Sequence, residues 1–217
     1  AARAAAAGVL AFRGRTADPL AEPERLTVAQ AFDRLAGIDL PATLSAAGTD
    51  REALAAAARG AGVRVAPDDT WADIFSRVLV ERIEPHLGIG RPTILYEYPV
   101  AEAALARPTA RDPRVAERFE LFACGVELAN GFGELTDPVE QRRRFAVEMA
   151  EKHRVYGERY PVDEDFLLAL ARMPQASGIA LGFDRLVMLS TGAARIEQVL
   201  WAPVVESGSE RLPDSRN

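Results

Sequence analysis

The spacing of the apolar residues changes at Pro92, and this change constrains the fold more than any other feature of the chain. Before it, apolar side chains recur at helical spacing, most clearly over residues 71–83, behind a capping cluster of Asp68, Asp69 and Thr70. After it, segments 93–98, 116–122 and 126–132 are rich in β-branched and aromatic residues, as strands are. We therefore predict an α+β fold, with residues 1–90 mainly helical and the sheet within residues 91–205.

The other elements follow from caps and breakers. Thr27 caps a predicted helix over residues 28–36, and Asp50 opens another over 51–59. Asp137 and Asp163 cap helices that run to about residues 156 and 171. A short strand over 179–183 precedes a helix over 184–190. Residues 1–10 are interpreted as the end of a helix, 13–24 as a loop, 196–201 as a last strand and 206–217 as a mobile tail.

Composition excludes several classes of protein. The net charge is −6, whereas an autonomous nucleic-acid binder normally carries a basic surplus. Cys124 is the only cysteine, so the chain has neither an internal disulfide nor a cysteine-based zinc site. No apolar run approaches the ~18 residues that cross a bilayer, so we expect no membrane partner. A cytoplasmic location agrees with this cysteine usage.

Two glutamates are placed for metal binding by a predicted hairpin. If Ala123 and Cys124 form its tip, Glu120 and Glu127 lie directly opposite each other on one face of the sheet. Like charges in that arrangement are destabilising, and a magnesium ion between the carboxylates would remove the repulsion. The alternative is two solvated glutamates on an exposed face.

The following segment alternates an amide, an aromatic ring and a carboxylate. A strand would project Asn130, Phe132 and Glu134 onto one face, where they could hold an amino group and an aliphatic stem. Glu127 has the opposite parity, so it joins this face only if a bulge intervenes, which the two nearby glycines permit. The alternatives are an ordinary turn at residues 130–131 and a solvated Glu134.

A third segment, residues 177–189, combines small residues with an arginine. Residues 178, 180 and 182 would share one strand face and leave room for a flat ligand, while 179, 181 and 183 would face the core. Arg185 falls in the first turn of the next helix, where the helix dipole disfavours a cation. This position indicates an anionic partner such as a phosphate. The alternative is a surface arginine paired with Asp184 or another acid.

Together the three segments resemble class II lysyl-tRNA synthetases, and more closely the synthetase paralogues that attach β-lysine to elongation factor P. Ala180 favours the paralogues, because lysyl-tRNA synthetases usually carry glycine there. Gly133 departs from the histidine that is common in the paralogues. Within the three segments the resemblance is carried by Arg118-Phe-Glu-Leu-Phe, by Gly125-Val-Glu-Leu-Ala-Asn-Gly-Phe-Gly-Glu-Leu-Thr-Asp, and by Met173-Pro followed by Ser177-Gly-Ile-Ala-Leu-Gly-Phe-Asp-Arg-Leu-Val-Met-Leu. A fourth stretch, Gln141-Arg-Arg-Arg-Phe, adds to it.

The resemblance implies an antiparallel sheet flanked by helices and an ATP-dependent ligase. Lysine or (R)-β-lysine would be activated as an adenylate and passed to a lysine of elongation factor P; tRNA is not expected as the acceptor. Arg185 would be catalytic. The implied ATP ligands are Glu127, Leu128, Gly182 and Arg185. The implied magnesium ligands are Glu120 and Glu127, and the implied amino-acid ligands are Asn130, Phe132, Glu134 and Ala180.

The family's motifs 1 and 2 would lie upstream of the first residue. We therefore expect a single catalytic domain that is incomplete at its N-terminal side, and a homodimer only where the preceding part is present. Two other interpretations stay open. One is a non-catalytic truncated paralogue that binds an amino acid or a translation protein; the other is a fragment of a lysyl-tRNA synthetase.

Overall fold

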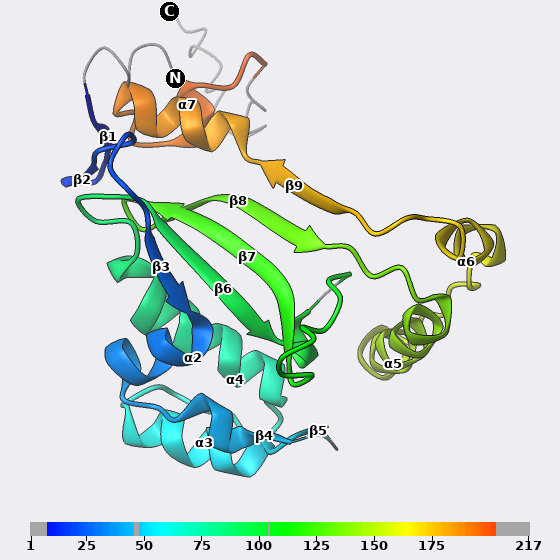
Figure 1. Ribbon diagram of the computed structural model, residues 1–217. Helices are drawn as coiled ribbons and strands as arrows, with labels where there is room; N and C mark the ends of the chain where they lie inside the picture. The colour runs from blue at the N-terminus through cyan, green and yellow to red at the C-terminus, as the bar shows by residue number, and fades with distance from the viewer. Residues whose placement is uncertain (1–7, 46–47, 104, 203–217) are drawn as a thin grey trace, which may run out of the picture.

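A five-stranded sheet organises the computed structural model, which describes residues 8–45, 48–103 and 105–202. The strand order is β3-β6-β7-β8-β9 (Figure 1). Strands β6 to β9 are antiparallel neighbours, as expected, and β3 joins the edge parallel to β6. The bounds are β3 (Glu24–Thr27), β6 (Thr93–Pro99), β7 (Val115–Ala123), β8 (Val126–Gly133) and β9 (Ser177–Leu181).

Helices lie on both sides of this sheet. Helices α2, α3 and α4 lie on one side, α7 lies on the other, and α5 and α6 stand beyond the end of the sheet (Figure 1). None of the helices in the described ranges is long and apolar enough to cross a membrane. The bounds are α2 (Val28–Ala31), α3 (Arg51–Gly60), α4 (Trp71–Val78), α5 (Pro138–Tyr156), α6 (Glu164–Leu170) and α7 (Phe183–Thr191).

The predicted caps are confirmed, because the side chains of Thr27, Asp50, Thr70, Asp137 and Asp163 each accept a hydrogen bond from the first turn of their helix. Helices α2 and α4 each continue into a wider, π-helical turn, so the predicted helical stretches 28–36 and 71–83 have the expected extent. The α+β fold is therefore confirmed, with a mixed sheet.

Two short strand pairs in the N-terminal part of the chain were not predicted. Strand β1 (Leu10–Phe12) pairs with β2 (Arg15–Ala17), where the end of a helix and a loop were expected. Strand β4 (Leu44–Ser45) pairs with β5 (Gly48–Thr49) before α3. Residues 1–7 and the predicted tail over 206–217 lie outside the described residues.

Ile196–Gln198 forms a single 3-10 turn, so the predicted last strand is wrong. The Gln198 side-chain oxygen accepts hydrogen bonds from the backbone N–H groups of Ala194 and Arg195. These bonds close the segment on itself, so the backbone does not extend to pair with a strand.

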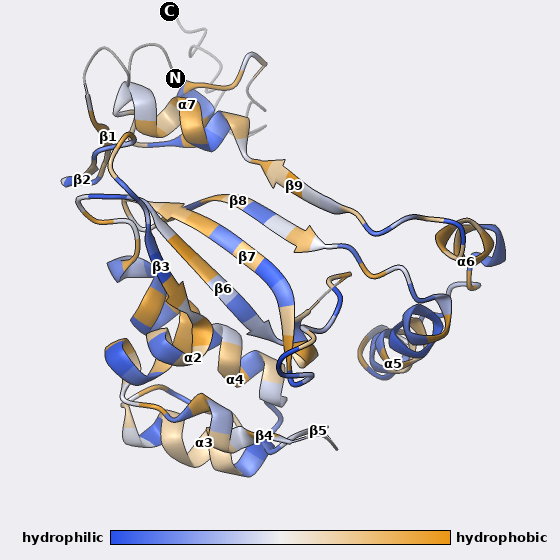
Figure 2. Cartoon of the chain, viewed as in Figure 1, coloured by the Kyte–Doolittle hydropathy of each residue, from blue (hydrophilic) through white to orange (hydrophobic). Residues whose placement is uncertain are grey.

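The main core lies between the sheet and the helices α2 to α4 (Figure 2). The rings of Phe32 and Phe75 stack with their centroids 5.0 Å apart, and Leu95 and Phe122 reach them from the sheet. A second core joins α7 and β1 to the other face of β7 and β8. The β7–β8 hairpin is therefore packed on both faces. The division of the chain near residue 91 remains a proposal.

The turn between β7 and β8 is formed by Cys124 and Gly125, one residue beyond the predicted tip. Both residues have positive φ, +56° and +74°, as in a type I′ hairpin turn, and glycine adopts this conformation without strain. The Cys124 N–H donates to the Gly88 carbonyl at 2.7 Å, and the Gly125 N–H donates to the Leu87 carbonyl at 2.8 Å. The segment after α4 thus holds the turn in place.

We predict that alanine at Gly88 is much more costly than alanine at Gly37. Both glycines have left-handed backbones, with φ of +69° and +68°. A Cβ on Gly88 would lie 2.5 Å from the Ala123 Cα and from the Phe122 carbonyl oxygen, whereas a Cβ on Gly37 meets nothing within 4 Å. The left-handed conformation costs about 1 kcal/mol for either alanine. In urea unfolding, the free energy of unfolding should fall by about that amount in Gly37→Ala and by several times as much in Gly88→Ala. Equal decreases in the two variants would contradict the close packing at Gly88.

Candidate active site

Two rows of paired residues cross the sheet on one face. Arg118 pairs with Phe132 and Phe132 with Gly178; Glu120 pairs with Asn130 and Asn130 with Ala180. Residues that pair across antiparallel strands project from the same face. The structure therefore brings together residues from all three segments that the sequence singled out.

The predicted pairing of Glu120 with Glu127 is wrong. Glu120 lies opposite Asn130, and Glu127 lies opposite Phe122. The turn begins one residue later than predicted, and the register shifts so that Leu128 is an extra residue in β8. This bulge nevertheless gives Glu127 the same parity as Asn130, which is the condition under which Glu127 was expected to join the face.

The Glu120 carboxylate is buried and hydrogen-bonded on both oxygens. Its Oε1 accepts from Arg118 Nη2 at 2.6 Å and from Asn130 Nδ2 at 3.4 Å, and its Oε2 accepts from the Tyr98 hydroxyl at 2.6 Å. The Arg118 guanidinium carbon lies 4.5 Å from the centre of the Tyr98 ring. Burial, and then the Glu120 charge, raise the pKa of Tyr98 well above its ordinary value, so this hydroxyl remains a donor.

The predicted ATP residues lie together where β9 leads into α7. Arg185 Nη1 donates to the Glu127 carbonyl oxygen at 2.9 Å and to Glu127 Oε2 at 3.0 Å. The Gly182 N–H donates to the Leu128 carbonyl at 2.8 Å, which ties the end of β9 to the bulge. Arg185 thus pairs with Glu127 and not with Asp184. The Arg185 and Glu127 side chains remain 46% and 36% exposed, so a ligand can reach both.

Two acceptor groups on the site face lack donors. Among the described residues, no side chain donates to or pairs with the Glu134 carboxylate, which lies over Gly178, 2.8 Å from where a Cβ would stand. Asn130 Oδ1 is buried and has no hydrogen-bond partner within the described part of the chain. Asn130 also lies inside β8, so the alternative of a turn there is wrong. The half-buried Glu134 carboxylate, an acceptor without a donor, suits a cationic ligand that carries N–H groups.

Residues 179, 181 and 183 were predicted to face the core, but the structure leaves all three exposed. Ile179, Leu181 and Phe183 are 62%, 51% and 65% exposed. Helix α7 packs on β1 and on the side of β7 and β8 that carries Ala123 and Leu128, so within the described ranges it does not cover β9. The expectation assumed a packed layer over this strand that the described elements do not supply.

Sequence reasoning missed two groups close to this face, Glu84 and Tyr98. Burial raises the pKa of Glu84, the carboxylates of Glu120 and Glu127 raise it further, and Arg185 lowers it. Glu84 therefore shares the electrostatic environment of the site. It lies before Pro85 at a helix end, and Tyr98 lies in an ordinary apolar strand. Neither position carries a motif in the sequence.

Of the two predicted magnesium ligands, Glu127 is better placed to bind the ion than Glu120. In the described ranges, no group of three or more His, Cys, Asp or Glu side chains is arranged to hold a metal. Magnesium usually takes only one or two carboxylates and completes its shell with substrate phosphates and water. Glu127 is accessible and fits that role. Glu120 would have to exchange Arg118 or Tyr98 for the ion.

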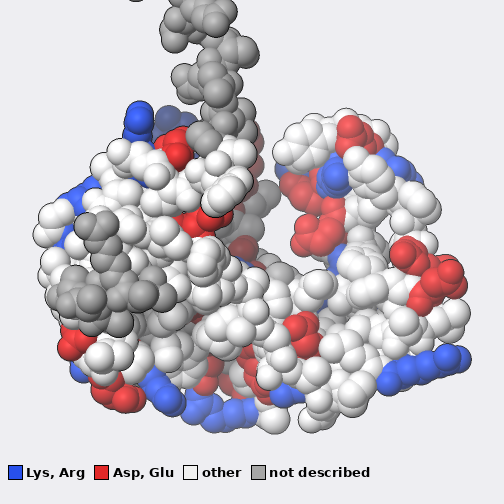
Figure 3. Space-filling view, turned by 90° about the horizontal axis from the view of Figure 1, so that it is seen from above, with Lys and Arg blue, Asp and Glu red and all other residues white. Residues whose placement is uncertain are grey.

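A separate cleft of about 1140 Å³ lies between the start of α4, the C-terminal half of α5 and residues 160–163. Its walls carry several acidic side chains, among them Asp68, Asp73 and Glu148, and the rings of Tyr156 and Tyr160. Acidic residues also stand along the hollow between the main body and the part that contains α5 and α6 (Figure 3). None of the predicted site residues lines the cleft.

We predict a pH-dependent stability from Glu102, whose carbonyl accepts a hydrogen bond from Arg118 Nη1. Burial raises the pKa of its carboxyl group from 4.5 to about 7. Between these pH values the folded chain keeps a proton that the unfolded chain has lost, so stability falls as pH rises through this window. The Tm of Glu102→Gln should match that of the wild type near pH 4 and should be higher than that of the wild type at pH 8. A wild-type pH dependence that persists unchanged in the variant would contradict this assignment.

Comparison with known proteins places the chain in a family. The family model of class II tRNA synthetases (D, K and N) matches residues 15–206. An elongation factor P–(R)-β-lysine ligase of Proteus mirabilis is 44% identical over 184 residues, which cover 83% of this chain and 55% of that protein. A ligase of the same name from Sodalis glossinidius is 41% identical over 180 residues, with coverage of 82% and 54%.

A lysine–tRNA ligase of Moorella thermoacetica is 36% identical over 203 residues, which cover 93% of this chain and 40% of that protein. The chain thus spans about half the length of the β-lysine ligases that it matches, and less of the tRNA ligase. The family match covers most of the chain, including the paired strands and the arginine of α7 that form the candidate site. The chain belongs to the class II tRNA synthetase family (D, K and N).

Proposed function

We propose that this chain supplies the amino-acid pocket and part of the ATP site of a lysyl-tRNA synthetase-like ligase. The ligase activates lysine or (R)-β-lysine as an adenylate and transfers it to a lysine of elongation factor P. The observation that carries the proposal is the Glu134 carboxylate, which has no cationic partner among the described residues and lies on the same face as the unpartnered Asn130 Oδ1. The names of the β-lysine ligase relatives support the choice of acceptor.

The amino-acid end of the site is formed by Asn130, Phe132, Glu134 and Ala180. Glu134 pairs with a substrate ammonium group, since a charge-assisted hydrogen bond is the strongest contact that this face offers. Phe132 packs beside small residues and provides an apolar wall for the aliphatic stem of the substrate. Ala180 lies opposite Asn130, so its methyl group narrows the pocket next to the amide.

The ATP end is formed by Arg185, Glu127, Leu128 and Gly182. A phosphate that binds Arg185 takes the place of Glu127, whose carboxylate would then be free to hold magnesium. When bound there, the ion would neutralise charge on the phosphates. The substrate carboxylate attacks the α-phosphorus, a new P–O bond forms and pyrophosphate leaves. Arg185 stabilises the negative charge that develops during this step, which makes it the catalytic residue of this chain.

The remaining parts of the proposal follow from the same assignment. Glu120 is the second candidate magnesium ligand, on the condition that it exchanges a protein partner for the ion. We propose a lysine side chain of elongation factor P as the acceptor and not tRNA, a cytoplasmic location, and a homodimer where an N-terminal part is present.

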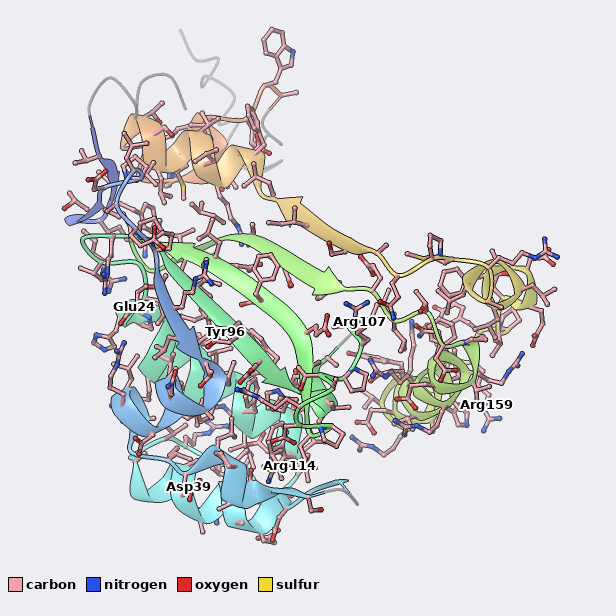
Figure 4. All side chains as sticks on the ribbon, in the orientation of Figure 1. Glu24, Asp39, Tyr96, Arg107, Arg114 and Arg159 are labelled. Atoms are coloured by element: carbon pink, nitrogen blue, oxygen red, sulfur yellow. The ribbon has the colours of Figure 1, made fainter. Side chains whose placement is uncertain are left out.

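The pocket is tested by calorimetry of lysine binding to this chain. Lysine should bind the wild type, and Glu134→Gln should weaken binding about tenfold or more, or about 1.4 kcal/mol, because the charged acceptor is lost. Glu117→Gln is the matched control, since Glu117 lies on β7 with the opposite parity to Glu120 and pairs with Arg107. Arg107 lies beside the end of β8 in Figure 4.

Equal affinities of Glu134→Gln and the wild type would remove the basis of the proposed pocket. A loss of affinity in the Glu117→Gln control as large as in Glu134→Gln would show a general disturbance of the sheet, and would equally contradict the assignment.

A further inference from the structure

We propose that the ion pair of Glu127 with Arg185 makes the site selective for a polyphosphate that comes with a divalent cation over the same polyphosphate alone. Glu127 competes with the anion for Arg185, and a cation on Glu127 ends that competition. The inference rests on the proposed function, because it concerns the ATP end of the same site.

The first step concerns how Arg185 is held. Its Nη1 donates to the Glu127 carbonyl oxygen at 2.9 Å and to Glu127 Oε2 at 3.0 Å. The stem of the side chain passes over Gly182, where a Cβ would lie 3.3 Å from Arg185 Cδ. Gly182 is fixed in turn, because its N–H donates to the Leu128 carbonyl at 2.8 Å. Contacts within the chain therefore direct the guanidinium group to Glu127.

The second step concerns the strength of this pair. Both side chains are partly exposed, so water screens the attraction between them. An exposed pair of this kind lowers the affinity for a competing anion by about two- to fivefold. The pair is thus weak enough to open for a ligand, and its effect on that ligand is large enough to measure.

The third step concerns the other charges around the guanidinium group. Arg118 neutralises Glu120, with their side chains 2.6 Å apart. Burial raises the pKa of Glu84, the carboxylates of Glu120 and Glu127 raise it further, and Arg185 lowers it. Glu84 therefore lies within reach of the same charges. A polyphosphate on Arg185 comes close to the carboxylates of Glu84 and Glu127, and like charges repel.

The last step links the two ligands. A cation on Glu127 and an anion on Arg185 break the same ion pair, so the first to bind removes a competitor of the second. Thermodynamic linkage requires each to strengthen the other by the same factor. A polyphosphate with a divalent cation meets a released Arg185. The same polyphosphate alone must displace Glu127 and then remain beside its charge.

The first measurement is calorimetry with inorganic tripolyphosphate, in EDTA and then with Mg²⁺. In EDTA, Glu127→Gln should bind the anion about two- to fivefold more tightly than the wild type, because Arg185 is released. Glu84→Gln is the matched control: it removes a nearby carboxylate, whereas the guanidinium group donates to Glu127, so it should strengthen binding by less. Mg²⁺ should raise the affinity of the wild type about tenfold or more, and that of Glu127→Gln by clearly less.

The second measurement needs no phosphate. The side-chain Nε–H signal of Arg185 is assigned by nuclear magnetic resonance from its loss in Arg185→Lys. Mg²⁺ alone should move this signal in the wild type toward its position in Glu127→Gln, and should leave it in place in that variant. Circular dichroism shows whether each variant is folded. If Glu127→Gln is not, Glu127→Asp, whose carboxylate is one methylene further from Arg185, takes its place in both measurements.

The two measurements separate the inference from the function on which it rests. Equal effects of Glu127→Gln and Glu84→Gln in EDTA would overturn the inference, because repulsion alone would then explain both. An Arg185 signal that is the same in the wild type and in Glu127→Gln, with or without Mg²⁺, would overturn it as well, whatever the chain binds. A signal that moves with Mg²⁺ in a chain that binds no tripolyphosphate would support the competition and would count against the proposed ATP site alone.

Discussion

The register of β7 against β8 is the constraint on which the site depends. A strand that slips by one residue turns every side chain to the opposite face. The Cys124–Gly125 turn sets the register near the tip, and the bulge at Leu128 changes it once, so that Glu127 and Asn130 lie on the same face. Packing of the hairpin against both cores opposes slippage.

The three carboxylates on this face differ in whether they are paired and in how deeply the pair is buried. Arg118 neutralises Glu120 inside the protein, whereas Arg185 pairs with Glu127 near the surface, where an anion can compete for it. Glu134 has no such partner among the described residues. A buried ion pair is costly to break, while an exposed one contributes little and exchanges easily. The first pair is therefore a fixed part of the sheet face, and the second pair can open for the ligand that we propose.

Local patterns predicted the elements well, and tertiary contacts account for what they missed. Helix caps were predictable because a Thr or Asp before an apolar periodic run satisfies nearby backbone N–H groups. The turn was misplaced by one residue because Gly125, and not Ala123, tolerates the left-handed backbone. A bulge between Glu127 and Asn130 was considered in the sequence only as a condition, and the glycines expected to permit it follow Asn130, whereas the extra residue is Leu128. The contact of Tyr98 with Glu120 joins two strands, so no spacing in the sequence indicates it.

The central claim is that a lysine-like cation binds on the face that carries Asn130 and Glu134. A crystal structure of the chain with lysine tests it most directly. The account predicts one ammonium group within hydrogen-bond distance of the Glu134 carboxylate and the aliphatic stem against Phe132. Lysine bound instead in the acidic cleft between α4 and α5, with the sheet face empty, would contradict it.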